Sequence, residues 1–422
     1  MNGPVRVLVI GQGYVGLPLA MRAVEAGHDV IGFEIDEARA KRLAAGESFV
    51  EDVPSDVLTS ALKSGKYAVA ADPGGIGAFD VAVITVPTPL REGIPDLSYI
   101  ESAAAMVAPH LRSGSTVVLE STTYPGTTDE LVVPILEHGS NLTAGTDFHV
   151  GYSPERIDPG NREWTFTTTP KVVSGIDAAS LEAVRGFYDT LVARTVPVSG
   201  TREAELAKLL ENTFRHVNIA LVNELAMFAR DLDIDIWEAI DAASSKPFGF
   251  LPFTPGPGVG GHCLPIDPSY LSWRVKRSLG RSFRFVELAN DVNDHMPDYV
   301  VQRLMTALNR RRQALNGSRI LLLGLAYKRN TGDARESPAL VVADRLVTLG
   351  AEVRGADPHV VEAHVDRRVA RVEASAEELA EADAVVVLTE HDAFDRDLVA
   401  RHARYVLDTR RWMAEGPTVE YL

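Results

Sequence analysis

The sequence predicts an α/β protein in which a long central helix joins two Rossmann-like doubly wound domains. Short apolar runs typical of buried parallel strands alternate with helical patterns in both the first and the last third of the chain. Between them, residues 201–231 keep one helical pattern, which at 1.5 Å per residue gives a helix of roughly 45 Å. We therefore expect domains at residues 1–198, 199–312 and 313–422, with the linking helix in the second.

The N-terminal residues carry the pattern of a dinucleotide-binding unit. An apolar strand pattern at 5–10 leads into Gly-Gln-Gly-Tyr-Val-Gly at 11–16 and then into a helical pattern, and a second strand pattern at 29–33 ends in Glu34. Glycine at 11 permits the tight turn, glycine at 13 admits a pyrophosphate, and glycine at 16 lets the helix pack on the sheet. The helix N-terminus then faces the phosphates.

Glu34 and Arg39 bear on which dinucleotide binds. A carboxylate at the end of the second strand accepts hydrogen bonds from ribose hydroxyls and repels a 2′-phosphate, whereas a nearby arginine can accommodate that phosphate. The position of Glu34 favours NAD over NADP. The residues expected around the cofactor are Gly11, Gly13, Tyr14, Val15, Gly16, Glu34 and Arg39.

Polar turns follow two further strand patterns in this part of the chain. The pattern at 81–86 ends in Pro87-Thr88-Pro, and the pattern at 116–120 ends in Ser121-Thr122-Thr-Tyr-Pro-Gly-Thr-Thr. Ligands of doubly wound sheets lie beyond the carboxyl ends of the strands. These four named residues are therefore candidates for the nicotinamide end of the site, although proline turns also serve as plain connections.

The single cysteine, Cys263, lies in the glycine-rich segment 255–267, which ends at Asp267. Glycines at 256, 258, 260 and 261 would let a flat ligand ring approach the sulfur. A lone cysteine is also typical of a buried, unreactive thiol, and this loop alone leaves both interpretations open. One cysteine excludes an intramolecular disulfide and a CxxC pair, which indicates a reducing compartment, and we expect the cytoplasm.

The last third repeats the strand and helix patterns without the glycine fingerprint. We therefore expect it to bind a ligand other than a second NAD. Lys328 and Arg335 follow its first strand pattern and Arg410 follows its last, where they can hold phosphates or serve as ordinary surface charges.

Composition excludes several other classes of protein. A net charge of −16 argues against broad nucleic-acid binding. The chain contains no uninterrupted apolar run of about 18 residues, so a membrane span is not expected. We expect no bound metal.

Jointly, the motifs resemble those of the UDP-glucose/GDP-mannose dehydrogenase family over essentially the whole chain. The shared features are the glycine fingerprint, the turns at 87–89 and 121–128, Glu155, the Lys208/Asn212 pair, the segment 260–267 around Cys263, and the segment 324–338. The resemblance implies oxidation of a sugar's primary alcohol to a carboxylate with two NAD in succession. Segments 246–258 and 266–273 are most similar to the branch that oxidises C6 of UDP-N-acetylglucosamine, with UDP-N-acetylmannosamine and UDP-glucose as alternatives.

The resemblance also implies catalytic roles. Cys263 would hold the sugar as a thiohemiacetal and then as a thioester. Lys208 and Asn212 would stabilise the developing oxyanions, and Asp267 would orient Lys208 or a water. Thr122 and Glu155 would position the hydrolytic water, with Glu155 as the base. Substrate contacts are implied for Glu155, Lys208, Asn212, Arg215, Phe253, Gly260, Lys328 and Arg410.

The chain also differs from the pattern of the family at some positions. The resemblance implies that Arg335 touches the cofactor and that the long helix makes a homodimer. UDP-glucose members often carry a second glutamate where this chain has Pro159, so a two-carboxylate scheme does not carry over. The roles of His262 and Lys246 stay open. A non-catalytic NAD and nucleotide-sugar sensor would need the glycine loops but not Cys263, so the motifs favour an enzyme.

Overall fold

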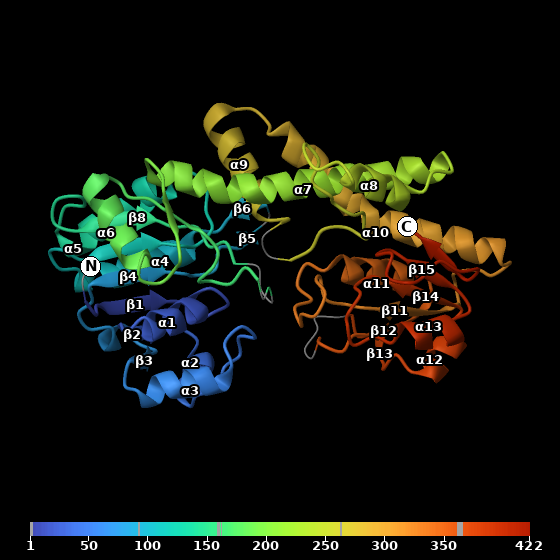
Figure 1. Cartoon of the computed structure of the whole chain (residues 1–422), viewed down its shortest axis with the longest axis horizontal. Helices are drawn as coiled ribbons and strands as arrows, with labels where there is room; N and C mark the ends of the chain where they lie inside the picture. The colour runs from blue at the N-terminus through green and yellow to red at the C-terminus, as the bar shows by residue number, and fades with distance from the viewer. Residues whose placement is uncertain (1–2, 92, 158–160, 162, 262–263, 361–365) are drawn as a thin grey trace. The chain divides into compact units, whose positions relative to one another are not determined.

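The computed structural model describes residues 3–91, 93–157, 161, 163–261, 264–360 and 366–422. Cys263, His262 and Pro159 lie outside these residues. The chain divides into two compact units, Met1–Glu211 and Asn212–Leu422 (Figure 1). The three-domain division expected from the sequence stays a prediction.

The first unit is built on a parallel sheet of order β3-β2-β1-β4-β7-β8. Its strands are β1 (Arg6–Ile10), β2 (Asp29–Phe33), β3 (Tyr67–Ala70), β4 (Val81–Ile84), β7 (Thr116–Leu119) and β8 (His149–Tyr152). The helices are α1 (Gly16–Glu25), α2 (Glu37–Ala44), α3 (Ser55–Lys63), α4 (Ser98–Val107), α5 (Val133–Ser140) and α6 (Ala178–Tyr188). Two small sheets pair β5 (Leu90–Arg91) with β6 (Ile94–Pro95) and β9 (Lys171–Val173) with β10 (Thr195–Pro197).

Helices on both faces explain why the strands of this sheet are apolar throughout. Successive side chains of a strand point to opposite faces, and in β1 Val7 and Val9 join one hydrophobic cluster while Leu8 and Ile10 join another. The first cluster includes residues of α1, α3 and α6, and the second includes residues of α4 and α5. This arrangement leaves the carboxyl edge of the sheet for the polar turns.

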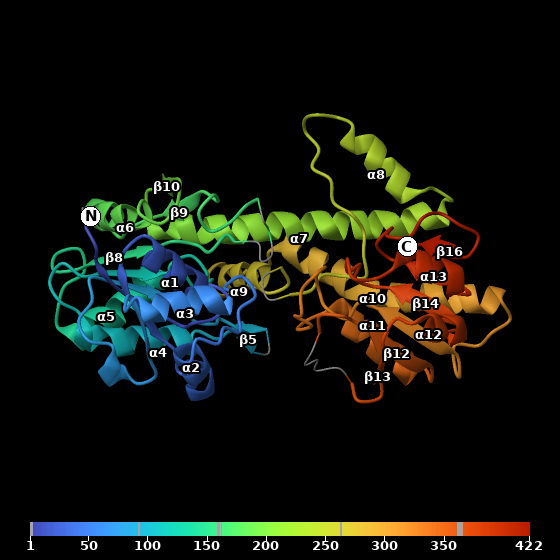
Figure 2. The same ribbon diagram turned by 60° about the horizontal axis from the view of Figure 1, so that its bottom comes forward.

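The second unit repeats the same topology. Its parallel sheet has the order β13-β12-β11-β14-β15-β16. The strands are β11 (Arg319–Leu323), β12 (Glu352–Ala356), β13 (Ala370–Arg371), β14 (Ala384–Val387), β15 (Val406–Asp408) and β16 (Val419–Tyr421), and the helices are α8 (Ile236–Ser244), α9 (Asp267–Leu279), α10 (Arg284–Arg310), α11 (Pro338–Thr348), α12 (Ala376–Glu381) and α13 (Arg396–His402). Figure 2 shows α8 standing clear of this sheet. Strand order 3-2-1-4-5-6 is that of the dinucleotide-binding fold, and both sheets follow it, which confirms the predicted fold class.

Helix α7 (Thr201–Asp231) begins in the first unit and continues into the second, over the 31 residues that its pattern predicted. Its second half packs on α10 through a buried amide pair, in which Asn223 Nδ2 donates to Asn293 Oδ1 at 2.9 Å. The Asn223 oxygen accepts the Gly256 N–H at 2.9 Å. Paired amides explain how α7 tolerates this asparagine on a buried face.

Among the residues that the structure describes, no helix combines the length and the apolar character that a membrane crossing requires.

Candidate active site

The glycine turn between β1 and α1 has the shape that a dinucleotide requires. Gly11 has a φ of +90°, and a Cβ there would lie 2.8 Å from the Thr85 carbonyl oxygen. A Cβ at Gly16 would lie 1.8 Å from the Gly11 oxygen, whereas a Cβ at Gly13 would meet no described atom within 4 Å. The outer glycines are therefore needed for packing, and Gly13 leaves room for a pyrophosphate at the start of α1.

Glu34 lies where the sequence predicts the adenosine end of the cofactor. It is buried at the end of β2, where Oε2 accepts the Gln12 N–H at 3.2 Å and Oε1 accepts the Asp36 N–H at 3.1 Å. A carboxylate offers about four acceptor positions, so two remain for ribose hydroxyls. Arg39 is exposed, with its guanidinium 5.4 Å from the centre of the Phe49 ring. The residues present fit NAD.

The structure brings together the two polar turns at the carboxyl edge of the sheet. Ser121, which follows β7, donates its hydroxyl to the Val86 carbonyl oxygen at 2.8 Å, next to exposed Pro87. Thr88 and Thr122 are half-buried. Their contact with a nicotinamide stays a prediction.

Glu205 of α7 anchors the second of these turns, a role that no local sequence pattern indicated. Its carboxylate is fully buried and accepts the Gly126 N–H at 2.6 Å, the Thr128 N–H at 2.9 Å and the Thr128 hydroxyl at 2.7 Å. Burial raises the pKa of Glu205 to about 7, although these hydrogen bonds oppose the increase. The turn is thus tied to α7 one helical turn before Lys208.

This raised pKa makes stability depend on pH. The folded chain keeps the Glu205 proton at pH values where the unfolded chain, with its pKa near 4.5, has released it. The free energy of unfolding should therefore fall as pH rises from about 4.5 to 7, by up to about 3 kcal/mol. In urea unfolding across this range, Glu205→Gln should lack that part of the decline. Glu203→Gln, at an exposed position of the same helix, should keep it; equal slopes in both variants would contradict the assignment.

Lys208 and Glu155 meet within the first unit. The Lys208 ammonium donates to the Glu155 carbonyl oxygen at 2.5 Å, and each residue is only 9% exposed. Glu155 Oε1 accepts the N–H groups of Arg156 at 2.6 Å and Ile157 at 2.5 Å. Glu155 is therefore a buried residue whose carboxylate is held by backbone N–H groups and whose carbonyl oxygen binds the Lys208 ammonium.

The Glu155 carboxylate is part of a buried polar network that was not predicted from the sequence. Lys171 Nζ lies 3.5 Å from Glu155 Oε2 and 2.8 Å from Glu120 Oε1, which also accepts the Tyr188 hydroxyl at 2.5 Å. Burial raises the pKa of Glu120, with the Lys171 charge opposing this, and burial also keeps the pKa of Tyr188 well above its usual value. The one feature of the sequence that could have indicated this network is the position of Glu120 directly after an apolar strand.

In the second unit, Asn212 and Asp267 form a buried pair. Asn212 Nδ2 donates to Asp267 Oδ2 at 2.5 Å, and Asp267 is the first residue of α9. The structure shows Asp267 holding the amide of Asn212. Its expected role of orienting Lys208 or a water stays a prediction. Arg215 is exposed, and the half-buried Phe253 ring packs edge-on against Phe214 at 5.8 Å.

The glycines of segment 255–261 lie close to other residues of the second unit. A Cβ at Gly256 would lie 2.7 Å from an Arg410 guanidinium nitrogen, one at Gly260 would lie 2.6 Å from the Glu336 carbonyl oxygen, and one at Gly261 would lie 2.7 Å from the Tyr327 ring. These glycines make room for the chain's own residues, and the approach of a ligand ring to the sulfur stays a prediction. Cys263 itself lies outside the described residues.

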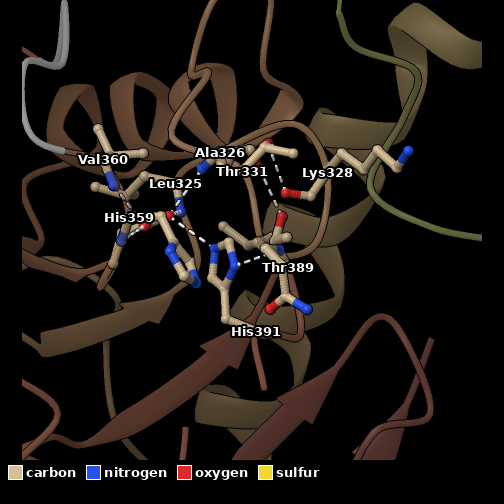
Figure 3. Close-up of polar contacts among 12 residues, drawn as sticks. Leu325, Ala326, Lys328, Thr331, His359, Val360, Thr389 and His391 are labelled. Carbon is tan, nitrogen blue, oxygen red and sulfur yellow. Dashed lines mark hydrogen bonds and ion pairs between the residues drawn. The ribbon is translucent and has the colours of Figure 1, made fainter. Parts of the chain in front are cut away.

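A polar cluster fixes the loop that follows β11 (Figure 3). Asp357 Oδ2 accepts the N–H groups of Leu325 at 2.7 Å and Ala326 at 2.9 Å and the His391 Nε2–H at 3.0 Å. Burial alone would raise the pKa of Asp357, but these hydrogen bonds lower it. Half-buried Lys328 extends away from the cluster in Figure 3, and its contact with a substrate stays a prediction.

Two arginines were expected to contact bound ligands: Arg335 the cofactor and Arg410 the substrate. Arg335 contacts Asp333 at 2.7 Å. Arg410 Nε donates to the Leu388 carbonyl oxygen at 2.9 Å and lies 3.7 Å from Glu390. Within the described ranges, no group of three or more His, Cys, Asp or Glu side chains could hold a metal ion.

Three family models match the chain in succession. They are the NAD binding domain of the UDP-glucose/GDP-mannose dehydrogenase family at residues 5–192, its central domain at 202–295 and its UDP binding domain at 321–415. These matches confirm the resemblance seen in the motifs and NAD as the cofactor.

Individual relatives agree over nearly their whole length. The chain is 34% identical to UDP-N-acetyl-D-mannosamine dehydrogenase of Pyrococcus horikoshii, over 98% of this chain and 97% of that protein. It is 36% identical to UDP-N-acetyl-D-glucosamine 6-dehydrogenase of Salmonella typhi, over 92% and 91%. A solved structure of the UDP-D-ManNAc dehydrogenase from Pyrococcus horikoshii superposes with a TM-score of 0.88 at 32% identity, covering 99% of this chain and 98% of the other. The chain therefore belongs to the UDP-glucose/GDP-mannose dehydrogenase family and is an NAD-dependent UDP-sugar dehydrogenase.

Proposed function

We propose that this enzyme oxidises C6 of a UDP-N-acetylhexosamine, with UDP-N-acetylglucosamine as the preferred substrate, to the uronic acid. The similarity of segments 246–258 and 266–273 to the branch that oxidises UDP-N-acetylglucosamine supports this substrate. UDP-N-acetylmannosamine and UDP-glucose are the alternatives. The observation that carries the reaction type is the burial of the Lys208 ammonium and the Glu155 carboxylate in one place, where Lys208 donates to the backbone carbonyl oxygen of Glu155. A buried ammonium suits oxyanion stabilisation and a nearby carboxylate suits proton transfer.

The proposed chemistry assigns a role to each catalytic residue. Bound NAD would accept a hydride in each of the two oxidation steps. The Cys263 thiolate adds to the aldehyde carbon and is later displaced by water from the thioester. Glu155 takes the proton of that water, with Thr122 positioning it. Lys208 and Asn212 donate to the oxyanions, and Asp267 orients the Asn212 amide. Because a reactive thiol needs a reducing environment, we place the reaction in the cytoplasm.

We propose protein contacts to the diphosphate and to the sugar of the substrate. Lys328 and Arg410 would bind the diphosphate as cations. Arg215, Phe253 and Gly260 would contact the substrate nearer the sugar. Arg335 is proposed as a cofactor contact.

Two measurements test the reaction together. Each candidate UDP-sugar is incubated with NAD, the NADH formed per sugar nucleotide consumed is counted, and the product is identified by mass spectrometry. A ratio near two with UDP-N-acetylglucosamine supports the proposal. A ratio near one would exclude the double oxidation, and faster turnover of UDP-glucose or UDP-N-acetylmannosamine would replace the substrate.

We also propose a homodimer formed through α7. In the second unit, this helix exposes large apolar side chains at helical spacing, with exposed fractions between 41% and 69%: Phe214, Leu221, Leu225, Phe228 and the adjacent Leu232. A stripe of this length marks a protein contact. Sedimentation should give twice the chain mass, and Phe228→Glu should shift the protein towards monomer. A monomeric wild-type chain would refute the dimer.

A further inference from the structure

The network behind Glu155 has an unusual charge balance. Two buried carboxylates, Glu120 and Glu155, share the ammonium group of Lys171. The Lys171 side chain is 6% exposed, and its partners Glu120 and Glu155 are 0% and 11% exposed. A buried ammonium that served only as a structural ion pair would need one carboxylate, and a second one adds an uncompensated negative charge. The second carboxylate therefore calls for an explanation.

The geometry divides the ammonium unequally between the two acids. The distance from Lys171 Nζ is 2.8 Å to Glu120 Oε1 and 3.5 Å to Glu155 Oε2. Glu120 Oε1 also accepts the Tyr188 hydroxyl, while its Oε2 has no hydrogen-bond partner among the described residues. Aromatic rings complete the ammonium's surroundings, with Phe166 at 5.6 Å and Tyr188 at 5.3 Å. Glu120 is thus held firmly, and Glu155 keeps a looser contact suited to a group that must exchange a proton.

Other charged groups near Glu155 are directed elsewhere. Lys208 donates to the backbone carbonyl oxygen of Glu155. The Arg156 guanidinium pairs with Glu211 at 2.7 Å and donates to the Pro170 carbonyl oxygen at 2.6 Å. Among the described side chains, Lys171 is therefore the cation that the structure places at the Glu155 carboxylate, with Glu120 and the Tyr188 hydroxyl beyond it.

We propose that Lys171 is a positioning residue for Glu155: its ammonium holds the Oε2 atom in place, while Glu120, which also accepts the Tyr188 hydroxyl, competes for the same ammonium. The inference rests on the proposed role of Glu155 as the base in thioester hydrolysis. It assigns the control of one proton acceptor, in the loop after β8, to three buried residues: one directly after β7, one in β9 and one at the end of α6. The Glu155 oxygen that faces Lys171 is distinct from Oε1, which two backbone N–H groups already hold.

The test compares substitutions of opposite electrostatic sign. Lys171→Met removes the cation at nearly constant volume, so the acidic limb of the kcat–pH profile should move up by about one pH unit or more. Glu120→Gln removes the competing anion and leaves the cation to Glu155, so the same limb should move down. Lys171→Arg should restore most of the wild-type profile, and the KM values for NAD and UDP-sugar should stay within about twofold in all three.

Folding must be separated from positioning, because removing one member of a buried ion pair destabilises a protein. The double variant Lys171→Met/Glu120→Gln removes both charges, so it should be more stable than Lys171→Met while its acidic limb stays shifted upward. Thermal midpoints and NAD binding are measured for every variant, with exposed Lys63→Met as the matched control. An acidic limb that stays at the wild-type pH in Lys171→Met and in the double variant would overturn the inference, whatever their stability.

A separate variant distinguishes this failure from failure of the proposed function. Glu155→Gln should lose the acidic limb and accumulate enzyme-bound thioester, detectable by mass spectrometry of the intact protein. If Glu155→Gln retains the limb, then Glu155 is not the base and both ideas fail. If it loses the limb but Lys171→Met does not shift it, only the positioning role of Lys171 fails.

Discussion

Replacing Cys263 by serine is expected to lower formation of the carboxylate product by roughly 10³-fold or more, while NAD and UDP-sugar still bind. A serine hydroxyl is largely protonated at neutral pH and has no adjacent base assigned to it, so it cannot replace a thiolate as the group that holds the aldehyde. Steady-state NADH production measures the loss, and calorimetric titration with each ligand measures binding.

Two comparisons make this result specific to the nucleophile. Cys263→Ala should lose the same activity, since neither variant can form a thioester. With wild-type enzyme, rapid acid quenching during turnover should trap a sugar adduct on the peptide that contains Cys263. Full conversion to the carboxylate by the serine variant would exclude the covalent scheme.

Much of the first unit follows from patterns local in the sequence. Residues 7–10 of β1 are all apolar because helices cover both faces of the sheet. The turn after β1 needs glycine at 11 and 16 because a Cβ at either position would lie too close to a backbone oxygen, as the structure confirms. Glu34 lies where a strand ends, so its placement follows from the strand. Local sequence predicts such features because a few neighbouring residues determine them.

The network around Glu155 could not be predicted in this way. Glu120, Lys171 and Tyr188 come from three different elements, and their contact depends on how α6 and β9 pack beside β7 and β8. Each residue by itself has an ordinary alternative as a surface charge or a core phenol. Burial, which sets the raised pKa of Glu120, is a property of the folded unit and leaves no mark on residues adjacent in sequence.

The cysteine segment shows a different limit. Its glycines correctly indicate that something approaches the backbone closely, but not what approaches it. Arg410, Glu336 and Tyr327 take that space within the second unit. A glycine shows only that a side chain is not tolerated, so the identity of the neighbour needs the fold.

Lys208→Met is expected to lower kcat by roughly 10²–10³-fold, the cost of removing one oxyanion donor from a buried site. The buried ammonium of Lys208 is held at the Glu155 carbonyl oxygen, so its position is fixed before any substrate arrives, and methionine keeps its length without its charge. KM should change much less than kcat if the ammonium acts mainly on the transition state. Lys63→Met, at an exposed position, should behave as wild type. An equal loss of NAD binding and turnover in Lys208→Met would instead show that the ammonium holds the Glu155 turn in place, and the oxyanion role would then fall to Asn212, whose amide Asp267 already orients.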